Sequence, residues 1–185
     1  MLIVLLGAGN GLIHAFEQSA SERAMNSIKI FPGWTSKSYD GLKEGRRIRL
    51  DNKDLNTTNK NFPDHVIKAG ATVYQGGVNL SFGPEYVNLN LSGVYPNHTE
   101  VEVVKLFKGR FINEIDIKER RKVIVLHKKT AEILFDKTHT DPIGQFVNAG
   151  NVVYQVVGLY NDKGDSGDSD AYLPFTCLLY TSDAA

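Results

Sequence analysis

Apolar and polar residues divide the chain into an apolar start, a short polar stretch and a long series of short strands. Residues 1–8 are almost all apolar, and an apolar stripe at helical spacing continues to Phe16. Residues 17–26 are polar and rich in good helix formers. The apolar run is shorter than the roughly 20 residues that span a bilayer, and no basic residue precedes it as in a signal peptide. We predict that residues 1–26 are the end of a first transmembrane helix and its stalk; a buried first element of a soluble domain is the alternative.

After residue 27 the pattern changes from helical to extended. Apolar and polar residues alternate over 86–91, and residues 122–126 form a dense β-branched run. Residues 127–135 place their apolar positions on one side, which predicts a helix. Further strands are expected over 27–34, 66–74, 78–82, 145–147, 151–160 and 171–175. The predicted fold class is α+β, with mostly antiparallel strands and a few short helices after the membrane-exiting helix.

Three local signals make sharper predictions about turns and helix ends. Gly76-Gly77 lies between two apolar runs and predicts a hairpin turn. Thr99 with Glu102 has the spacing of a capping box at a helix start. Pro174 indicates that the last strand lies at an edge of the sheet or ends there.

Composition narrows the function classes without naming one. The chain has 21 basic and 21 acidic residues, so its formal net charge of +0 argues against a nucleic-acid partner held by a strong global field. Its single Cys excludes an internal disulfide and a cysteine zinc cluster. The five His show no paired helical spacing that would indicate a metal site.

The last nine residues, 177–185, read CLLYTSDAA. This string matches the translation of a common sequencing-transposon adapter in one reading frame. We expect it not to be native and exclude it from fold reasoning, as fusion scars are excluded. A native apolar segment is the alternative.

Several motifs resemble cofactor, catalytic or calcium sites but lack residues or spacing that such sites require. The glycines at 7, 9 and 11 resemble a dinucleotide turn, but Leu12 stands where a third glycine is needed. The loop 162–170 contains Gly-Asp-Ser-Gly and several acids, yet it lacks the spacing of a serine-protease site or a calcium loop. We therefore expect no catalytic, cofactor-binding or metal-binding residue. The basic clusters 46–49 and 120–122 are expected to be solvated turns, with contact to lipid headgroups or an acidic partner as the lesser alternative.

The order of short motifs from residue 93 onward is more specific. Gly-Val-Tyr-Pro at 93–96 is followed by Gly-Arg-Phe at 109–111, Asp-Pro-Ile-Gly at 141–144, Val-Val-Gly at 156–158 and Tyr-Leu-Pro-Phe at 172–175. In this order the chain resembles the MacB-like periplasmic core domain of FtsX-like ABC transporter permeases. The resemblance covers nearly the whole chain to Thr176 and is loose over 40–82. It divides the chain into residues 1–26, 27–176 and 177–185.

The resemblance implies structural, non-catalytic roles for its motif residues. Gly109 would allow a turn where a side chain would clash, and Arg110 would pair with an acid such as Asp116 or cap carbonyls. The remaining motif residues would fix connections and strand ends; they are Pro142, Gly144, Gly158 and Pro174.

The function that the resemblance implies is relay of movement rather than chemistry. The chain would be the periplasmic domain of a permease fragment at the bacterial inner membrane. It would pass ATP-driven movement of a cytoplasmic ATPase outward for export or envelope signalling. The implied partners are the ATPase, a second permease copy and a periplasmic adaptor or envelope protein, with the membrane bound through the N-terminal helix. A soluble binding module without a membrane link is the alternative.

Overall fold

The computed structural model describes residues 13, 27–48, 50, 52–102, 104–161 and 171–182. The chain divides into two compact units, Ala24–Ala69 and Gly70–Ala185 with Met1–Arg23. The membrane-exiting helix predicted over 1–26 lies outside the described residues, apart from the helical Ile13. Within the described part of the chain, every helix is too short or too polar to cross a bilayer.

The smaller unit consists of a two-stranded hairpin and helix α2 (Asn52–Asn61). The hairpin is held by an antiparallel bridge between Trp34 and Arg47 and a second between Tyr39 and Leu42. Its turn residues Asp40 and Gly41 both have positive φ (47° and 76°), as a tight hairpin turn requires. The strand predicted over 27–34 is therefore reduced to a bridge at its last residue.

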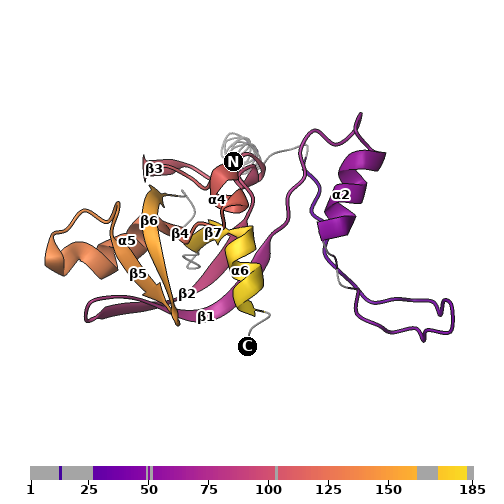
Figure 1. The fold of residues 1–185 in the computed structure, drawn as a ribbon, viewed down its shortest axis with the longest axis horizontal. Helices are drawn as coiled ribbons and strands as arrows, with labels where there is room; N and C mark the ends of the chain where they lie inside the picture. The colour runs from indigo at the N-terminus through magenta and orange to yellow at the C-terminus, as the bar shows by residue number, and fades with distance from the viewer. Residues whose placement is uncertain are drawn as a thin grey trace, which may run out of the picture. The chain divides into compact units, whose positions relative to one another are not determined.

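The larger unit is built on one mixed sheet (Figure 1). The strand order is β3-β6-β4-β7-β2-β1-β5, and β5 also pairs with β6, so six of the strands close into a ring. The β2–β7 and β4–β6 pairings are parallel, and the others are antiparallel. This agrees with the predicted α+β class. The strands are β1 (Val73–Phe82), β2 (Glu85–Val94), β3 (Leu106–Gly109), β4 (Val123–His127), β5 (Phe146–Ala149), β6 (Val152–Tyr160) and β7 (Ala171–Pro174).

The prediction of a hairpin turn at Gly76-Gly77 is wrong. Both glycines lie inside β1, where the register with β2 shifts between Gln75 and Val78. Gly77 has φ +69°, so the two glycines form a bulge, and the chain reverses instead at Gly83-Pro84. Pro174 marks the end of β7, which lies between β4 and β2 and is not an edge strand.

Short helices connect the strands and cover the sheet. They are α3 (His98–Val101), α4 (Glu114–Lys118), α5 (Lys128–Phe135), the 3₁₀ turn η1 (Asp136–Thr138) and α6 (Phe175–Ser182). Helix α5 confirms the prediction over 127–135, and its start is capped by the His127 side chain. The predicted capping box at Thr99 is wrong, since the Thr99 hydroxyl donates to the Pro96 carbonyl. α5 and α6 both pack against β2.

The main core fills the space between the sheet and these two helices. Its fully buried side chains include Leu80, Leu126, Val156 and Leu173 from four strands. Leu178 of α6 is also fully buried and contacts Gly93 of β2 so closely that a Cβ there would lie 2.9 Å from the Leu178 Cβ. Residues 177–182 thus have a place in this fold, while their expected origin as an adapter translation stays a prediction.

Candidate functional site

Gly109 and Gly158 bring the end of β3 against β6 without room for a side chain. Gly109 has φ +78°, and a Cβ on it would contact the Val157 carbonyl oxygen and lie 2.9 Å from the Gly158 Cα. A Cβ on Gly158 would contact the Arg110 carbonyl oxygen. Gly158 lies inside β6, two residues before its end, so the expectation that it ends a strand is wrong. The two glycines allow the chain after β3 to turn directly over β6.

This turn delivers Arg110 to the buried carboxylate of Asp116 in α4. The Arg110 guanidinium donates to both carboxylate oxygens, at 2.5 and 3.1 Å, and also to the Phe111 carbonyl at 3.0 Å. Asp116 is fully buried, whereas 41% of the Arg110 side chain is exposed. A two-pronged pair of this kind fixes orientation as well as charge.

A capping box at the start of α4 holds the same carboxylate from its other side. The Asn113 N–H donates to Asp116 Oδ2 at 3.0 Å, and the Asp116 N–H donates to Asn113 Oδ1 at 2.9 Å. Burial raises the pKa of Asp116, but these hydrogen bonds and the charges of Arg110 and Arg121 outweigh it, so the net pKa is lowered. Asp116 is thus held as a carboxylate.

The arginine clamp, which we define as Arg110, Asn113 and Asp116, also connects to the C-terminal helix. The Thr176 hydroxyl at the start of α6 donates to the Ile117 carbonyl of α4 at 3.2 Å. The Arg121 N–H donates to the Asp116 carbonyl at 2.9 Å, which ties the clamp to the chain entering β4. The sheet edge, α4 and α6 are therefore joined by a short chain of polar contacts.

The other motif residues shape a turn between η1 and β5. Gly144 has φ +87°, and the Gln145 N–H donates to the Pro142 carbonyl at 3.2 Å. Asp141 precedes this turn and accepts the Ile143 N–H at 3.2 Å. The predicted motif residues thus lie in three places: the β3–β6 crossing with the clamp, this turn, and Pro174 at the end of β7.

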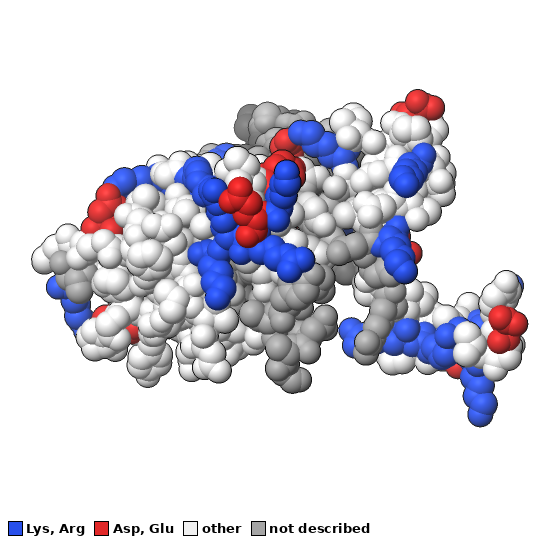
Figure 2. All heavy atoms as spheres, viewed as in Figure 1, with Lys and Arg blue, Asp and Glu red and all other residues white. Residues whose placement is uncertain are grey.

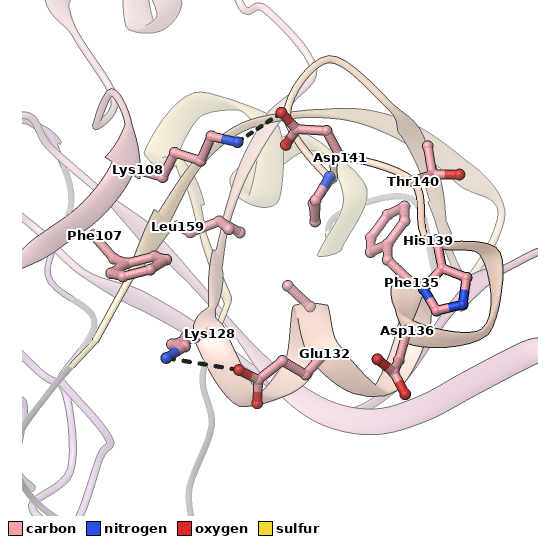
Figure 3. A pocket seen from close by; sticks show the side chains of 12 residues that line it. Phe107, Lys108, Lys128, Glu132, Phe135, Asp136, His139, Thr140, Asp141 and Leu159 are labelled. Carbon is pink, nitrogen blue, oxygen red and sulfur yellow. Dashed lines mark hydrogen bonds and ion pairs between the residues drawn. The ribbon is translucent and has the colours of Figure 1, made fainter.

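A shallow groove of about 290 Å³ lies beside this turn, between β3 and α5 (Figure 3). Lys108 Nζ lies 2.6 Å from Asp141 Oδ2 on one side, and Lys128 Nζ lies 3.7 Å from Glu132 Oε1 on the other. Lys128 also lies over the Phe107 ring, 4.9 Å from its centroid. Asp141 accepts hydrogen bonds from the Lys108 ammonium and from the Ile143 N–H, and both lower the pKa of Asp141.

The chemistry available in the larger unit is that of ion pairs and apolar surface. Lys108 and Lys128 face carboxylates in the groove, and Asp116 faces Arg110 in the clamp. Among the described residues, no three His, Cys, Asp or Glu side chains gather as metal ligands would.

Two features were missed by the sequence reasoning. The capping box at 113–116 has a readable signal, because Asn followed three residues later by an acidic residue is a helix-start pattern. A cluster of aromatic rings has no such signal. Between ring centroids, Tyr160 lies 4.8 Å from the half-buried Tyr172 and 5.1 Å from His127, and Phe111 lies 5.7 Å from Tyr172. These contacts join residues far apart in the chain.

Comparison with known protein families matches residues 1–184 to the MacB-like periplasmic core domain. Among curated proteins, the chain is 22% identical over 180 residues to the macrolide export ATP-binding/permease protein MacB of Bartonella henselae, covering 96% of the chain. It is 26% identical over 183 residues to the protein of the same name in Neisseria meningitidis serogroup A, covering 97%. The chain spans only 26% and 27% of these relatives.

Solved structures give the same result for the fold. The extracellular domain of the noncanonic ABC-type transporter YknZ from Gram-positive bacteria matches with a TM-score of 0.62 at 26% identity, over 74% of this chain and 67% of that one. The periplasmic region of MacB from Actinobacillus actinomycetemcomitans matches with a TM-score of 0.64 at 21% identity, over 82% and 67%.

Proposed function

Because the chain belongs to the MacB-like periplasmic core domain family, we propose that it is the extracytoplasmic head of an ABC transporter permease and that it relays movement. The observation that carries the proposal is the family match over residues 1–184, together with the fold shared with the extracellular domain of YknZ. In this proposal the head makes and breaks no covalent bonds, and ATP hydrolysis takes place in a separate or fused cytoplasmic ATPase.

Relay of movement requires a head that moves as one body, and the packing of the larger unit supports this. The closed ring of strands resists shear, since each of its six strands is hydrogen-bonded on both edges. The arginine clamp and the Thr176–Ile117 hydrogen bond couple the sheet edge to α6 through α4. We propose that displacement enters through the helical stalk predicted over residues 12–26.

We further propose a homodimeric permease in the bacterial inner membrane, with the head in the periplasm. Its partners would be the ATPase and a periplasmic adaptor or envelope protein. The curated relatives carry macrolide export in their names, so a drug-like compound is one candidate substrate. Export of a peptide or lipoprotein and regulation of an envelope enzyme are the others.

The test begins with the complete gene expressed in its own host with a C-terminal tag. External protease should cleave the head in spheroplasts but not in intact cells, and the tagged membrane fraction should retain an ATPase after mild detergent extraction. A head that stays protected in spheroplasts, or that is recovered without any membrane-bound portion, would contradict the proposal and favour the binding module.

A further inference from the structure

The hairpin arm of the smaller unit, residues 33–48, combines exposed aromatic and basic side chains. Every residue of the arm is exposed except the half-buried Thr35. Trp34 is 70% exposed and Tyr39 79% exposed. The arm contains four basic and two acidic residues, and Figure 2 shows basic side chains along its length. The basic residues are Lys37, Lys43, Arg46 and Arg47.

The arm has a defined local structure despite this exposure. The Thr35 N–H donates to the Arg46 carbonyl, and the Ile48 N–H donates to the Gly33 carbonyl, both at 2.8 Å. The Arg46 N–H also donates to the Thr35 hydroxyl at 3.0 Å. An isolated two-stranded hairpin is marginally stable in water, so a surface that binds this arm would also stabilise it.

We propose that the hairpin arm binds the anionic phospholipid surface of the membrane. This inference rests on the proposed function, because it takes the residues before the stalk predicted over 12–26 to be membrane-embedded. Lys and Arg side chains are attracted to anionic headgroups, while Trp and Tyr prefer the interface between headgroups and acyl chains. The arm carries both kinds of side chain together, with the aliphatic Leu42 and Ile48, which are 49% and 40% exposed.

The arm is long enough to reach across a headgroup layer. From Gly33 to the turn at Asp40 it spans seven residue steps, a reach of about 23 Å in an extended strand. An acidic protein partner would satisfy the charges but does not call for interfacial Trp and Tyr.

Trp34 is the only Trp of the chain, so its fluorescence reports on the arm alone. The 185-residue chain is mixed with vesicles of phosphatidylcholine, or of phosphatidylcholine with 30% phosphatidylglycerol, each with brominated acyl chains. We expect a blue shift and quenching of Trp34 with the anionic vesicles, both weakened by high salt. Emission that stays the same in anionic vesicles and in buffer would overturn the proposal. A blue shift that needs no vesicles and grows with protein concentration would also overturn it, in favour of a protein contact.

Paired charge reversals separate the arm from the rest of the chain. Lys37→Glu with Lys43→Glu leaves the backbone hydrogen bonds of the hairpin in place, and should lower partitioning measured by Trp34 quenching about fivefold or more. Lys105→Glu with Lys118→Glu changes net charge equally at exposed sites of the larger unit and should leave the quenching unchanged. Equal losses in both variants would overturn the proposal. Flotation with neutral vesicles tests the N-terminal membrane segment separately, so flotation there together with an unquenched Trp34 in anionic vesicles contradicts the arm proposal alone.

Discussion

Gly109 and Gly158 face each other across β3 and β6 so closely that a Cβ on Gly109 would contact the backbone of β6, and a Cβ on Gly158 would contact the backbone of Arg110 directly after β3. We predict a graded loss of stability for three alanine variants. Gly144→Ala adds only strain at a positive φ, because nothing lies within 4 Å of its Cβ, and should cost about 1 kcal/mol. Gly158→Ala adds only a backbone clash and should cost about 2–3 kcal/mol. Gly109→Ala adds both and should cost most.

Urea unfolding followed by circular dichroism measures this order. A Gly109→Ala chain as stable as the Gly144→Ala chain would show that β3 and β6 do not approach as described.

Removing the buried charge of the arginine clamp should be costly. Asp116→Asn leaves a neutral amide where Arg110 and the Asn113 N–H need a carboxylate, and we expect a loss of about 2–4 kcal/mol in the free energy of unfolding. Asp141→Asn removes an exposed carboxylate paired with Lys108 and serves as the matched control, with an unchanged melting temperature expected. Equal shifts in both variants would argue against the structural role of the clamp.

The same carboxylate predicts how acid affects the fold. The folded pKa of Asp116 is lowered below its unfolded value, so its contribution is present above about pH 4 and is lost as the pH falls through the folded pKa. The stability of the unmodified chain should therefore drop more steeply below pH 4 than that of Asp116→Asn, and the difference between the two should shrink as the pH falls further. Parallel curves from pH 6 to pH 2 would contradict this.

The raised pKa of Tyr154 predicts a loss of stability at high pH. Burial, with a smaller effect from Cys177, raises the pKa of Tyr154 to about 12. The contribution of neutral Tyr154 to the free energy of unfolding is complete below the unfolded pKa near 10. It is lost as the pH rises toward 12, and the free energy of unfolding falls by about 1 kcal/mol at pH 11. Tyr154→Phe should remove that part of the loss between pH 9 and pH 11. Tyr95, whose pKa is also raised, should retain its own part.

Short-range chemistry explains which elements were predictable. The helix over 127–135 followed from apolar spacing, and the strand Val123–His127 followed from a dense β-branched run. The pairing of Arg110 with Asp116 depends on six residues of local chain, and the family resemblance indicated it. Each of these predictions depends on residues that are close together in the sequence.

Long-range pairing explains what could not be predicted. Gly76-Gly77 has the composition of a hairpin turn, and only the register with β2 makes it a bulge. The closed ring depends on β5 meeting β1, through contacts such as Leu80 with Ala149, which no local pattern encodes. The groove beside α5 likewise depends on Lys108 meeting Asp141 from 33 residues away.

The central claim is that the larger unit moves as one body when the ATPase turns over. The most direct measurement uses the complete permease with its ATPase in lipid nanodiscs, spin-labelled at the exposed Lys118 and Ile133. We predict that trapping the ATPase in its ATP-bound state changes the Lys118–Lys118 distance between the two copies of a dimer and leaves the Lys118–Ile133 distance within each head unchanged. An unchanged distance between copies during ATP hydrolysis, or a changed distance within a head, would contradict the account.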